Sequence, residues 1–180
     1  MVDVLEAAPP FAGGWRSDVL SMFVCPPRGI VHLAGARDSR DAAALPAAGR
    51  CVSHAVGAVL SIGPDAYLCV GGADADSDAL QAWFRVVVDV SSAWIHLAVV
   101  GPKAAELLRK GCAIDLHERM FPPGACCATG FARMRVVLWR TSAEARYDML
   151  VGRSYALSLW AWLTEAAAQY GGQQTKEDSP

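Results

Sequence analysis

Charge is scarce in this sequence of 180 residues. Asp, Glu, Lys and Arg make up 19% of it, and the formal net charge is −2. The basic residues form no stripe, which argues against a nucleic-acid partner. No apolar run approaches the roughly 18 residues that a membrane-spanning helix needs. The first residues lack the basic and apolar regions of a signal peptide, so we expect a cytoplasmic protein.

Several motifs of catalysis and nucleotide binding are missing. The sequence contains no G-x-G-x-x-G loop, no G-x-x-x-x-G-K-[ST] loop and no G-x-S-x-G nucleophile turn. Gly101-Pro102 follows a predicted strand as a phosphate-binding turn would, but proline has no N–H to donate to an anion. We therefore interpret this dipeptide as the start of a helix.

Cysteine is present, but never as C-x-x-C. The six cysteines are Cys25, Cys51, Cys69, Cys112, Cys126 and Cys127. Disulfides are not expected in a cytoplasmic protein. Scattered cysteines in such a chain are usually small buried apolar residues, and that is how we interpret these.

Hydrophobic residues are plentiful, at 53% of the sequence, and there are six tryptophans. A large apolar surplus with so little charge indicates surface that another chain covers. A rigid, alanine-rich core accounts for the same composition, and composition alone leaves both interpretations open.

Hydrophobic periodicity and turn residues predict an alternation of strands and helices. We expect a loose N-terminal arm over residues 1–28 and a disordered polar tail over 172–180. Strands are predicted at 29–35, 51–63, 66–72, 85–90, 93–100, 126–140 and 145–152, and helices at 38–46, 74–85, 101–111 and 153–171. In the last helix, one apolar stripe is predicted to comprise Tyr155, Leu159, Trp162, Leu163, Ala166 and Tyr170.

The two halves of the chain repeat one another in outline. "IVHLAG" matches "WIHLAV", "AYLCVGG" matches "RYDMLVG", and "DALQAWF" matches "ALSLWAW". The pseudo-repeats run over about 29–90 and 91–171, and each reads strand, helix, strand, strand, helix. Such a unit does not cover its own sheet faces well, so we predict an α+β fold of two units packed together.

The stretch "DLHERMFPPGACCATGF", residues 115–131, carries the residue types of a reactive site. Asp115, His117 and Glu118 offer at most two metal ligands from one short segment. Cys126 and Cys127 are adjacent, so in a strand their side chains point to opposite faces. A second interpretation is that Cys126 or Cys127 is a nucleophile with His117 as its base. We favour the simplest interpretation, an extended connection into the next strand.

The four histidines are isolated from one another in the sequence: His32, His54, His96 and His117. His32 and His96 occupy equivalent places in the two repeats. We interpret them as sheet residues with satisfied nitrogens, and we hold a functional pair as the less favoured alternative.

A resemblance to a known family extends over nearly the whole chain. It is carried by "LSIGPDAYLCVGG", by "VVVDVSSAWIHLAVVGPKAAELLRKGCAIDLHERMFPPGACC" and by "LVGRS" with the closing tryptophan-rich helix. The chain resembles the gamma subunit of heterotetrameric sarcosine oxidase. This resemblance implies the fold of the folate-binding domain of the aminomethyltransferases, in agreement with the two-unit prediction.

The resemblance also implies a function. Complexes of this family demethylate sarcosine oxidatively to glycine and form hydrogen peroxide. FAD, FMN, NAD, tetrahydrofolate and zinc are expected on the alpha, beta and delta subunits, and none on this chain. Its role would be structural, with alpha as the main contact and no catalytic, cofactor or metal residues. The residues expected at the partner interface are His117, Phe121, Pro122, Pro123, Trp139, Trp160 and Trp162.

One departure from the related enzymes matters. Aminomethyltransferases carry a "TGYTGE"-like motif where this chain has "LWRTSAEARYD", so their folate-binding residues do not carry over. Three alternatives remain. They are the corresponding subunit of an N-methylglutamate-type dehydrogenase complex, a folate-dependent one-carbon transferase that acts alone, and a metal or redox protein using Cys126 or Cys127.

Overall fold

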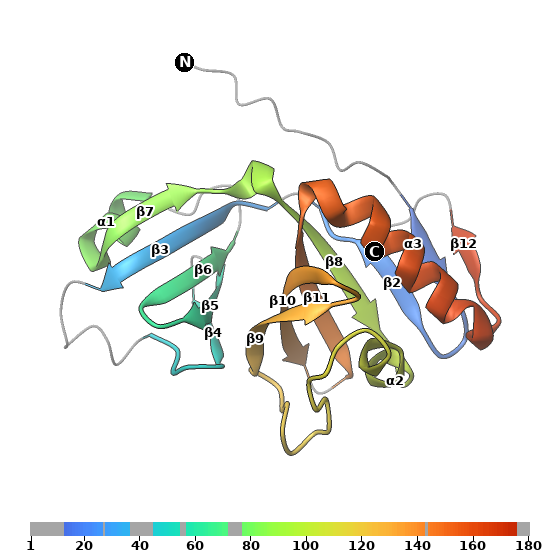
Figure 1. Ribbon diagram of the computed structural model, residues 1–180. Coiled ribbons are helices and arrows are strands. Elements are labelled where there is room, and N and C mark those ends of the chain that lie inside the picture. Colours follow the sequence, from blue (N-terminus) through green and yellow to red (C-terminus); the bar gives the residue numbers. More distant parts are fainter. Residues whose placement is uncertain are drawn as a thin grey trace.

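The described residues form two antiparallel sheets and three α-helices (Figure 1). The computed structural model describes residues 13–26, 28–36, 45–54, 57–71, 77–142 and 144–175. The five-stranded sheet lies at one end, and the seven-stranded sheet with helices α2 and α3 lies at the other. In the described parts of the chain, no helix has the length and apolar character needed to cross a membrane.

The five-stranded sheet is formed by β3 (Ile30–Ala36), β4 (Cys51–His54), β5 (Gly57–Gly63), β6 (Ala66–Val70) and β7 (Phe84–Asp89). Its strand order is β4-β5-β6-β3-β7. The predicted turn at Gly63-Pro64-Asp65 joins β5 to β6. The Asp65 carboxylate fixes this turn against β3, because it accepts hydrogen bonds from the backbone N–H groups of Gly35 and Ala36, both at 3.1 Å. Helix α1 (Ser77–Trp83) leads into β7.

The seven-stranded sheet has the order β12-β1-β2-β8-β11-β10-β9. Its long strands are β8 (Trp94–Val100), β9 (Cys126–Phe131), β10 (Met134–Ser142) and β11 (Arg146–Gly152). The short ones are β1 (Gly14–Arg16), β2 (Ser21–Val24) and β12 (Gln173–Thr175). Helices α2 (Ala104–Arg109) and α3 (Ala156–Ala167) pack on one face. The chain passes from the smaller sheet to β8 through the 3-10 turn Ser91–Ala93.

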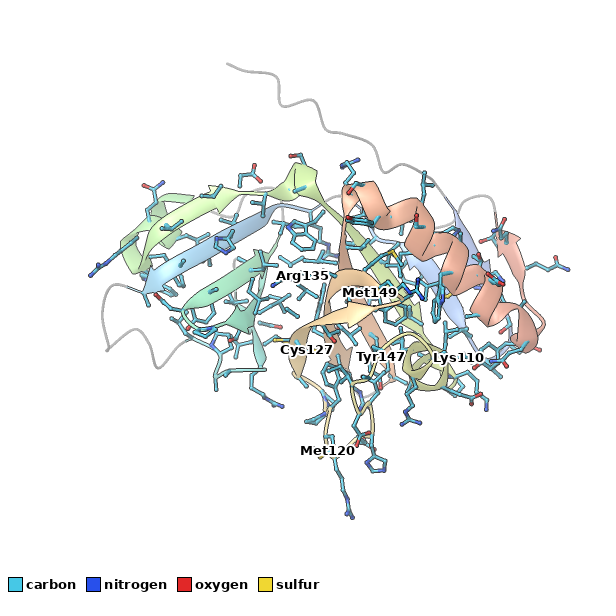
Figure 2. All side chains as sticks on the ribbon, viewed as in Figure 1. Lys110, Met120, Cys127, Arg135, Tyr147 and Met149 are labelled. Carbon is cyan, nitrogen blue, oxygen red and sulfur yellow. The ribbon has the colours of Figure 1, made fainter. Side chains whose placement is uncertain are left out.

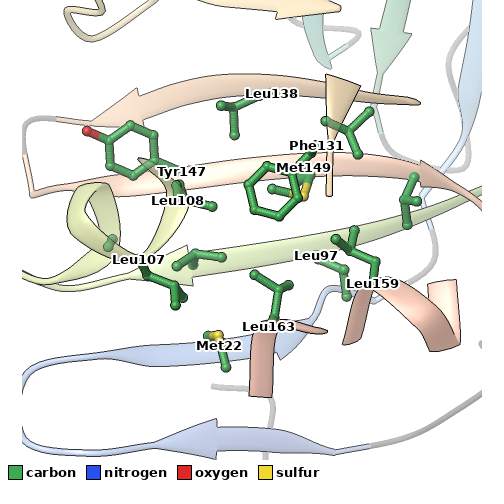
Figure 3. Close-up of a cluster of buried hydrophobic side chains, with 14 of the residues drawn as sticks. Met22, Leu97, Leu107, Leu108, Phe131, Leu138, Tyr147, Met149, Leu159 and Leu163 are labelled. Carbon is green, nitrogen blue, oxygen red and sulfur yellow. The ribbon is translucent and has the colours of Figure 1, made fainter. Parts of the chain in front are cut away.

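Alternation along the central strands of the seven-stranded sheet gives that sheet a core on each face, because successive side chains of a strand point to opposite faces. On the helix face, Leu97 and Met149 pack with Leu107, Leu159 and Leu163 of the helices, and Figure 3 shows these side chains meeting. On the other face, the seven-stranded sheet packs against the five-stranded sheet. That second core contains Ile30, Leu60, Leu68, Val70, Cys126, Val137, Trp139 and Leu150.

The two ends of the described chain differ from the sequence prediction. Residues 1–28 were expected to be an arm, yet β1 and β2 lie inside the seven-stranded sheet. The tail expected over 172–180 begins with β12, which pairs with β1 through Gly14↔Thr175, Trp15↔Gln174 and Arg16↔Gln173. β1, β2 and β12 are too short to show the alternation of apolar and polar residues that identifies a strand in a sequence. They form strands by pairing with their neighbours in the sheet. Residues 37–44, which hold most of the predicted helix 38–46, lie outside the described residues.

Helix 101–111 and its surroundings were predicted correctly in type but not in detail. Glu106 was expected to pair with Lys110, but Lys103 Nζ donates to its carboxylate at 2.7 Å, and Lys110 Nζ donates to the Ala166 carbonyl. Gly111 was expected to end the helix with a left-handed conformation, and its φ is not positive. Its small size serves packing instead, because a Cβ there would lie 2.4 Å from Cζ of Phe131.

Three further details correct the sequence prediction. Trp83 and Phe84 were placed with Leu80 on one helical face, but Phe84 begins β7 and Trp83 is 40% exposed. The predicted strand 126–140 is a hairpin, whose turn at Ala132-Arg133 has φ of 45° and 67°. Tyr155, placed on the buried stripe of the last helix, is 55% exposed. Gly171 does end that helix, in the left-handed conformation with φ of 70°.

The helix-face core should be sensitive to truncation of α3. Leu163 is fully buried, and Leu163→Ala is expected to lower the free energy of unfolding by about 2–5 kcal/mol through lost burial and a new cavity. Leu157→Ala is the matched control on the same helix, since Leu157 is 57% exposed, and it should stay within about 0.5 kcal/mol of wild type. Denaturant titration of both variants measures the difference.

Gly111 should tolerate no side chain. Gly111→Ala forces a methyl group against the buried Phe131 ring, and overpacking of this kind costs about 1–3 kcal/mol of stability. Gly130→Ala is the control, because a Cβ at Gly130 meets nothing within 4 Å. Equal melting temperatures of the two variants would contradict the packing role assigned to Gly111.

Candidate functional site

The segment 112–125 connects α2 to β9, and its polar residues close turns. The backbone N–H of His117 donates to Asp115 Oδ1 at 2.9 Å, and Arg119 N–H donates to His117 Nδ1 at 3.3 Å. Glu118 faces Arg140, with 3.5 Å between Oε1 and Nη2. Asp115, His117 and Glu118 are all exposed. In the described chain they are not brought together with a cysteine. The stretch connects α2 to β9, as expected, but it is folded into turns and is not the extended connection that the sequence predicted.

Cys126 and Cys127 point to opposite faces of β9, as adjacent strand residues must. The Cys126 thiol donates to the carbonyls of Arg50 and Ser61, at 3.0 and 3.3 Å, inside the core between the sheets. Cys127 packs against the helix-face core. Desolvation raises the pKa of Cys126 to about 12 and that of Cys127 to about 11. Both thiols are therefore protonated and weakly nucleophilic at neutral pH.

A shallow hollow of about 440 Å³ opens between β5 and β9. Its lining is mostly apolar and includes Ile62, Pro64, Cys127 and Ala128. None of its lining residues is a histidine, a carboxylate or a basic residue. A hollow of this kind accepts an apolar group and supplies no acid or base for catalysis.

The residues expected at a partner interface divide into two groups. Phe121 and Trp139 are only 5% and 3% exposed, and they fill the protein's own cores, so they are removed from the candidate interface. His117 and Pro123 are exposed, and Pro122, Trp160 and Trp162 are half-buried. Trp162 packs edge-on against Phe131, with ring centroids 5.0 Å apart.

Sequence reasoning missed several exposed apolar side chains. Met120, 67% exposed, lies at the loop that projects beyond the sheets (Figure 2). Val86 and Val88 of β7 are 43% and 49% exposed. Their cross-strand partners are Ala34 and His32, so they share the face that packs against the seven-stranded sheet further along. Within the described residues β7 is an edge strand, and no member of the second core comes from it. The alternating valines of this edge strand are therefore apolar surface that the described chain leaves exposed.

A buried polar cluster lies on the face of the seven-stranded sheet that packs against the five-stranded sheet. The Asp148 carboxylate accepts hydrogen bonds from His96 Nε2 at 2.9 Å, from the Thr141 hydroxyl, and from Arg146 Nη2 and Nε at 2.9 and 3.0 Å. Burial alone would raise the pKa of Asp148, but these hydrogen bonds together hold that pKa well below its usual range. Asp148 is therefore an ionised carboxylate in the core, compensated by Arg146.

His96 and Cys25 complete this cluster. The His96 ring stacks at a tilt against Trp139, with centroids 5.1 Å apart. Both nitrogens of His96 were expected to be satisfied, but Nδ1 is buried and has no hydrogen-bond partner within the described structure. Cys25 follows β2, and desolvation first, then the charge of Asp148, raises the pKa of its thiol to about 12. His32 belongs to the other sheet, so the repeat-related histidines form no pair.

Known proteins resemble this chain in sequence. The chain is 32% identical over 121 residues to sarcosine oxidase subunit gamma of Corynebacterium sp. strain P-1, and 34% identical over 122 residues to that of strain U-96. These alignments cover 64% and 65% of this chain. The chain spans 59% of the length of each of these curated relatives.

Solved structures resemble it in fold. A chain of the heterotetrameric sarcosine oxidase from Corynebacterium sp. U-96, in complex with pyrrole 2-carboxylate, matches with a TM-score of 0.75 and 28% identity, over 89% of this chain and 88% of that one. The glycine cleavage system aminomethyltransferase T from Bartonella henselae matches with a TM-score of 0.59 and 16% identity, over 81% of this chain and 45% of that one. The second likeness concerns the fold alone.

These likenesses confirm the expected resemblance to sarcosine oxidase gamma subunits and the expected aminomethyltransferase-like α+β fold. The model of the GCVT N-terminal domain matches residues 44–175, which include β4 to β12 and the helices α1, α2 and α3. The chain therefore belongs to the GCVT N-terminal domain family.

Proposed function

We propose that this chain is the gamma subunit of a heterotetrameric sarcosine oxidase, which demethylates sarcosine oxidatively to glycine and forms hydrogen peroxide. The observation that carries the proposal is the reciprocal match to one chain of such a complex, over 89% of this chain and 88% of that chain. The corresponding subunit of a complex acting on another N-methyl amino acid, such as N-methylglutamate, is the second candidate. Contacts to the substrate would lie on other chains in both.

The proposed role is assembly rather than catalysis. The residues that looked reactive in the sequence do not form a nucleophile with its base, because the Cys126 thiol is bonded to backbone carbonyls inside the core and His117 lies in an exposed turn. A folded chain without such a constellation contributes to an enzyme by stabilising the assembled state, which follows from mass action when a partner binds only the folded form.

The proposed partners are the alpha, beta and delta subunits, with alpha as the main contact. On this proposal FAD, FMN, NAD, tetrahydrofolate and zinc are bound by those subunits, and the complex is cytoplasmic. The interface retains His117, Pro122, Pro123, Trp160 and Trp162 from the sequence analysis. Its additional members are exposed apolar residues, namely Trp83, Val86, Val88, Met120, Tyr155 and Leu157.

Charge on β7 should weaken assembly. The double substitution Val86→Asp and Val88→Asp places two carboxylates on the exposed edge strand, where a partner would have to desolvate them. Co-expression with the other subunits, followed by affinity purification through this chain, should recover at least about tenfold less partner. The matched control is Gln173→Asp with Gln174→Asp on the exposed strand β12. Undiminished recovery with the valine double variant would remove β7 from the interface.

Folate binding separates the proposal from the stand-alone transferase. The segment 138–148 lacks the aminomethyltransferase motif and instead positions Thr141, Arg146 and Asp148 in a closed hydrogen-bond network. Calorimetric titration of the full chain with tetrahydrofolate should therefore give no binding heat. A saturable isotherm with one folate per chain would favour the transferase and count against a purely structural subunit.

A further inference from the structure

We propose that Cys25, His96 and Asp148 form a binding site for one divalent transition-metal ion, of which Zn²⁺ is the best match. The three residues are buried, and one potential ligand atom of each lies within 4.8 Å of the others. They come from three neighbouring strands, since Cys25 directly follows β2, His96 is in β8 and Asp148 is in β11. One sulfur, one nitrogen and one oxygen suit Zn²⁺ better than a hard cation such as Mg²⁺ or Ca²⁺. This inference does not depend on the proposed function.

The spacing is close to that of a filled site. Zinc–ligand bonds of about 2.0–2.3 Å in a tetrahedron place the ligand atoms roughly 3.3–3.7 Å apart. The 2.9 Å between His96 Nε2 and Asp148 Oδ1 would therefore widen slightly, and a spacing near the 4.8 Å limit of the group would shorten by about 1 Å. The backbone already holds the three strands together, because the N–H of Cys25 donates to the carbonyl of His96 at 2.9 Å and Asp148 pairs with Ala98 across the sheet. Side-chain rotation alone can then close the site. Three protein ligands leave the fourth position to a solvent molecule.

The charges also balance. A metal ion displaces the thiol proton, so a divalent cation with a thiolate, a carboxylate and a neutral imidazole carries no net charge. Without a bound ion, Arg146 neutralises the charge of Asp148, and it would compete with the ion for the same carboxylate oxygens. Its side chain is 35% exposed, against 2% for Asp148, so the guanidinium can move to solvent when a metal takes its place.

The imidazole presents one of its two nitrogens to the cluster. His96 Nδ1 is buried without a hydrogen-bond partner in the described chain, while Nε2 contacts the carboxylate. Nε2 is therefore the imidazole nitrogen that would bind the ion, in place of its hydrogen bond to Asp148.

Cobalt(II) is the probe, because thiolate ligation and tetrahedral geometry both appear in its absorption spectrum. The full chain, freed of metal with a chelator, is titrated with Co²⁺ and then with Zn²⁺ in competition. We expect one ion per chain, a thiolate-to-cobalt charge-transfer band and intense visible bands, all displaced by Zn²⁺. Cys25→Ser should abolish the charge-transfer band and weaken affinity at least about tenfold. Cys112→Ser, which removes a half-buried thiol elsewhere, should change neither.

Arg146→Gln distinguishes a metal site from a hydrogen-bond network and removes no ligand. If Arg146 competes with the ion, this variant should bind Co²⁺ about tenfold more tightly than wild type. It therefore remains informative where Cys25→Ser fails to fold, which circular dichroism reports. A spectrum of weak octahedral bands only, a charge-transfer band that survives Cys25→Ser, or no gain in affinity in Arg146→Gln would each overturn the proposal.

Discussion

The strands β8, β10 and β11 are covered on both faces, and this double burial dictates most of what the chain is. One face of each strand must meet the helices, and the other must meet the five-stranded sheet. The sequences "WIHLAVV" and "RYDMLVG" are accordingly almost continuous apolar runs, whereas a strand with one wet face would alternate. Many of the surplus hydrophobic residues are thus buried within the chain itself. Of the two explanations for that surplus, the core accounts for a large share.

A polar side chain in such a strand must bring its own partners, because water does not reach it. Asp148 does so with Arg146, Thr141 and His96 from its own and adjacent strands. The Arg146 side chain of this ion pair is 35% exposed, which lowers the desolvation free energy of keeping a charge next to the core. The cluster is therefore a device for tolerating a carboxylate in a buried sheet. The proposed metal site uses the same features. Sulfur, nitrogen and oxygen ligand atoms lie together in a buried place, and the partly exposed Arg146 can move away from Asp148.

The sequence predicted what local patterns encode and missed what only the assembled sheets encode. Dense aliphatic runs gave β3, β8 and β11, and the residues Gly63-Pro64-Asp65 gave the first hairpin turn. The second hairpin was missed because its turn residues, Ala132 and Arg133, are neither glycine nor asparagine despite positive φ. The cluster of Cys25, His96 and Asp148 was missed because strand order, not sequence proximity, unites them. A lone histidine and a lone aspartate inside apolar strands were the only local signal.

The same alternation that builds the second core also places apolar side chains on the part of the surface that we propose as an interface. Ile30, Leu60 and Leu68 of the five-stranded sheet face the seven-stranded sheet and are buried. Val86 and Val88 lie on that face too, but β7 is an edge strand and these two side chains are 43% and 49% exposed. An edge strand outside the core either carries polar side chains and is solvated, or carries apolar side chains that another protein can bury. Branched apolar residues at alternate positions, where a solvated strand would carry polar ones, favour the second.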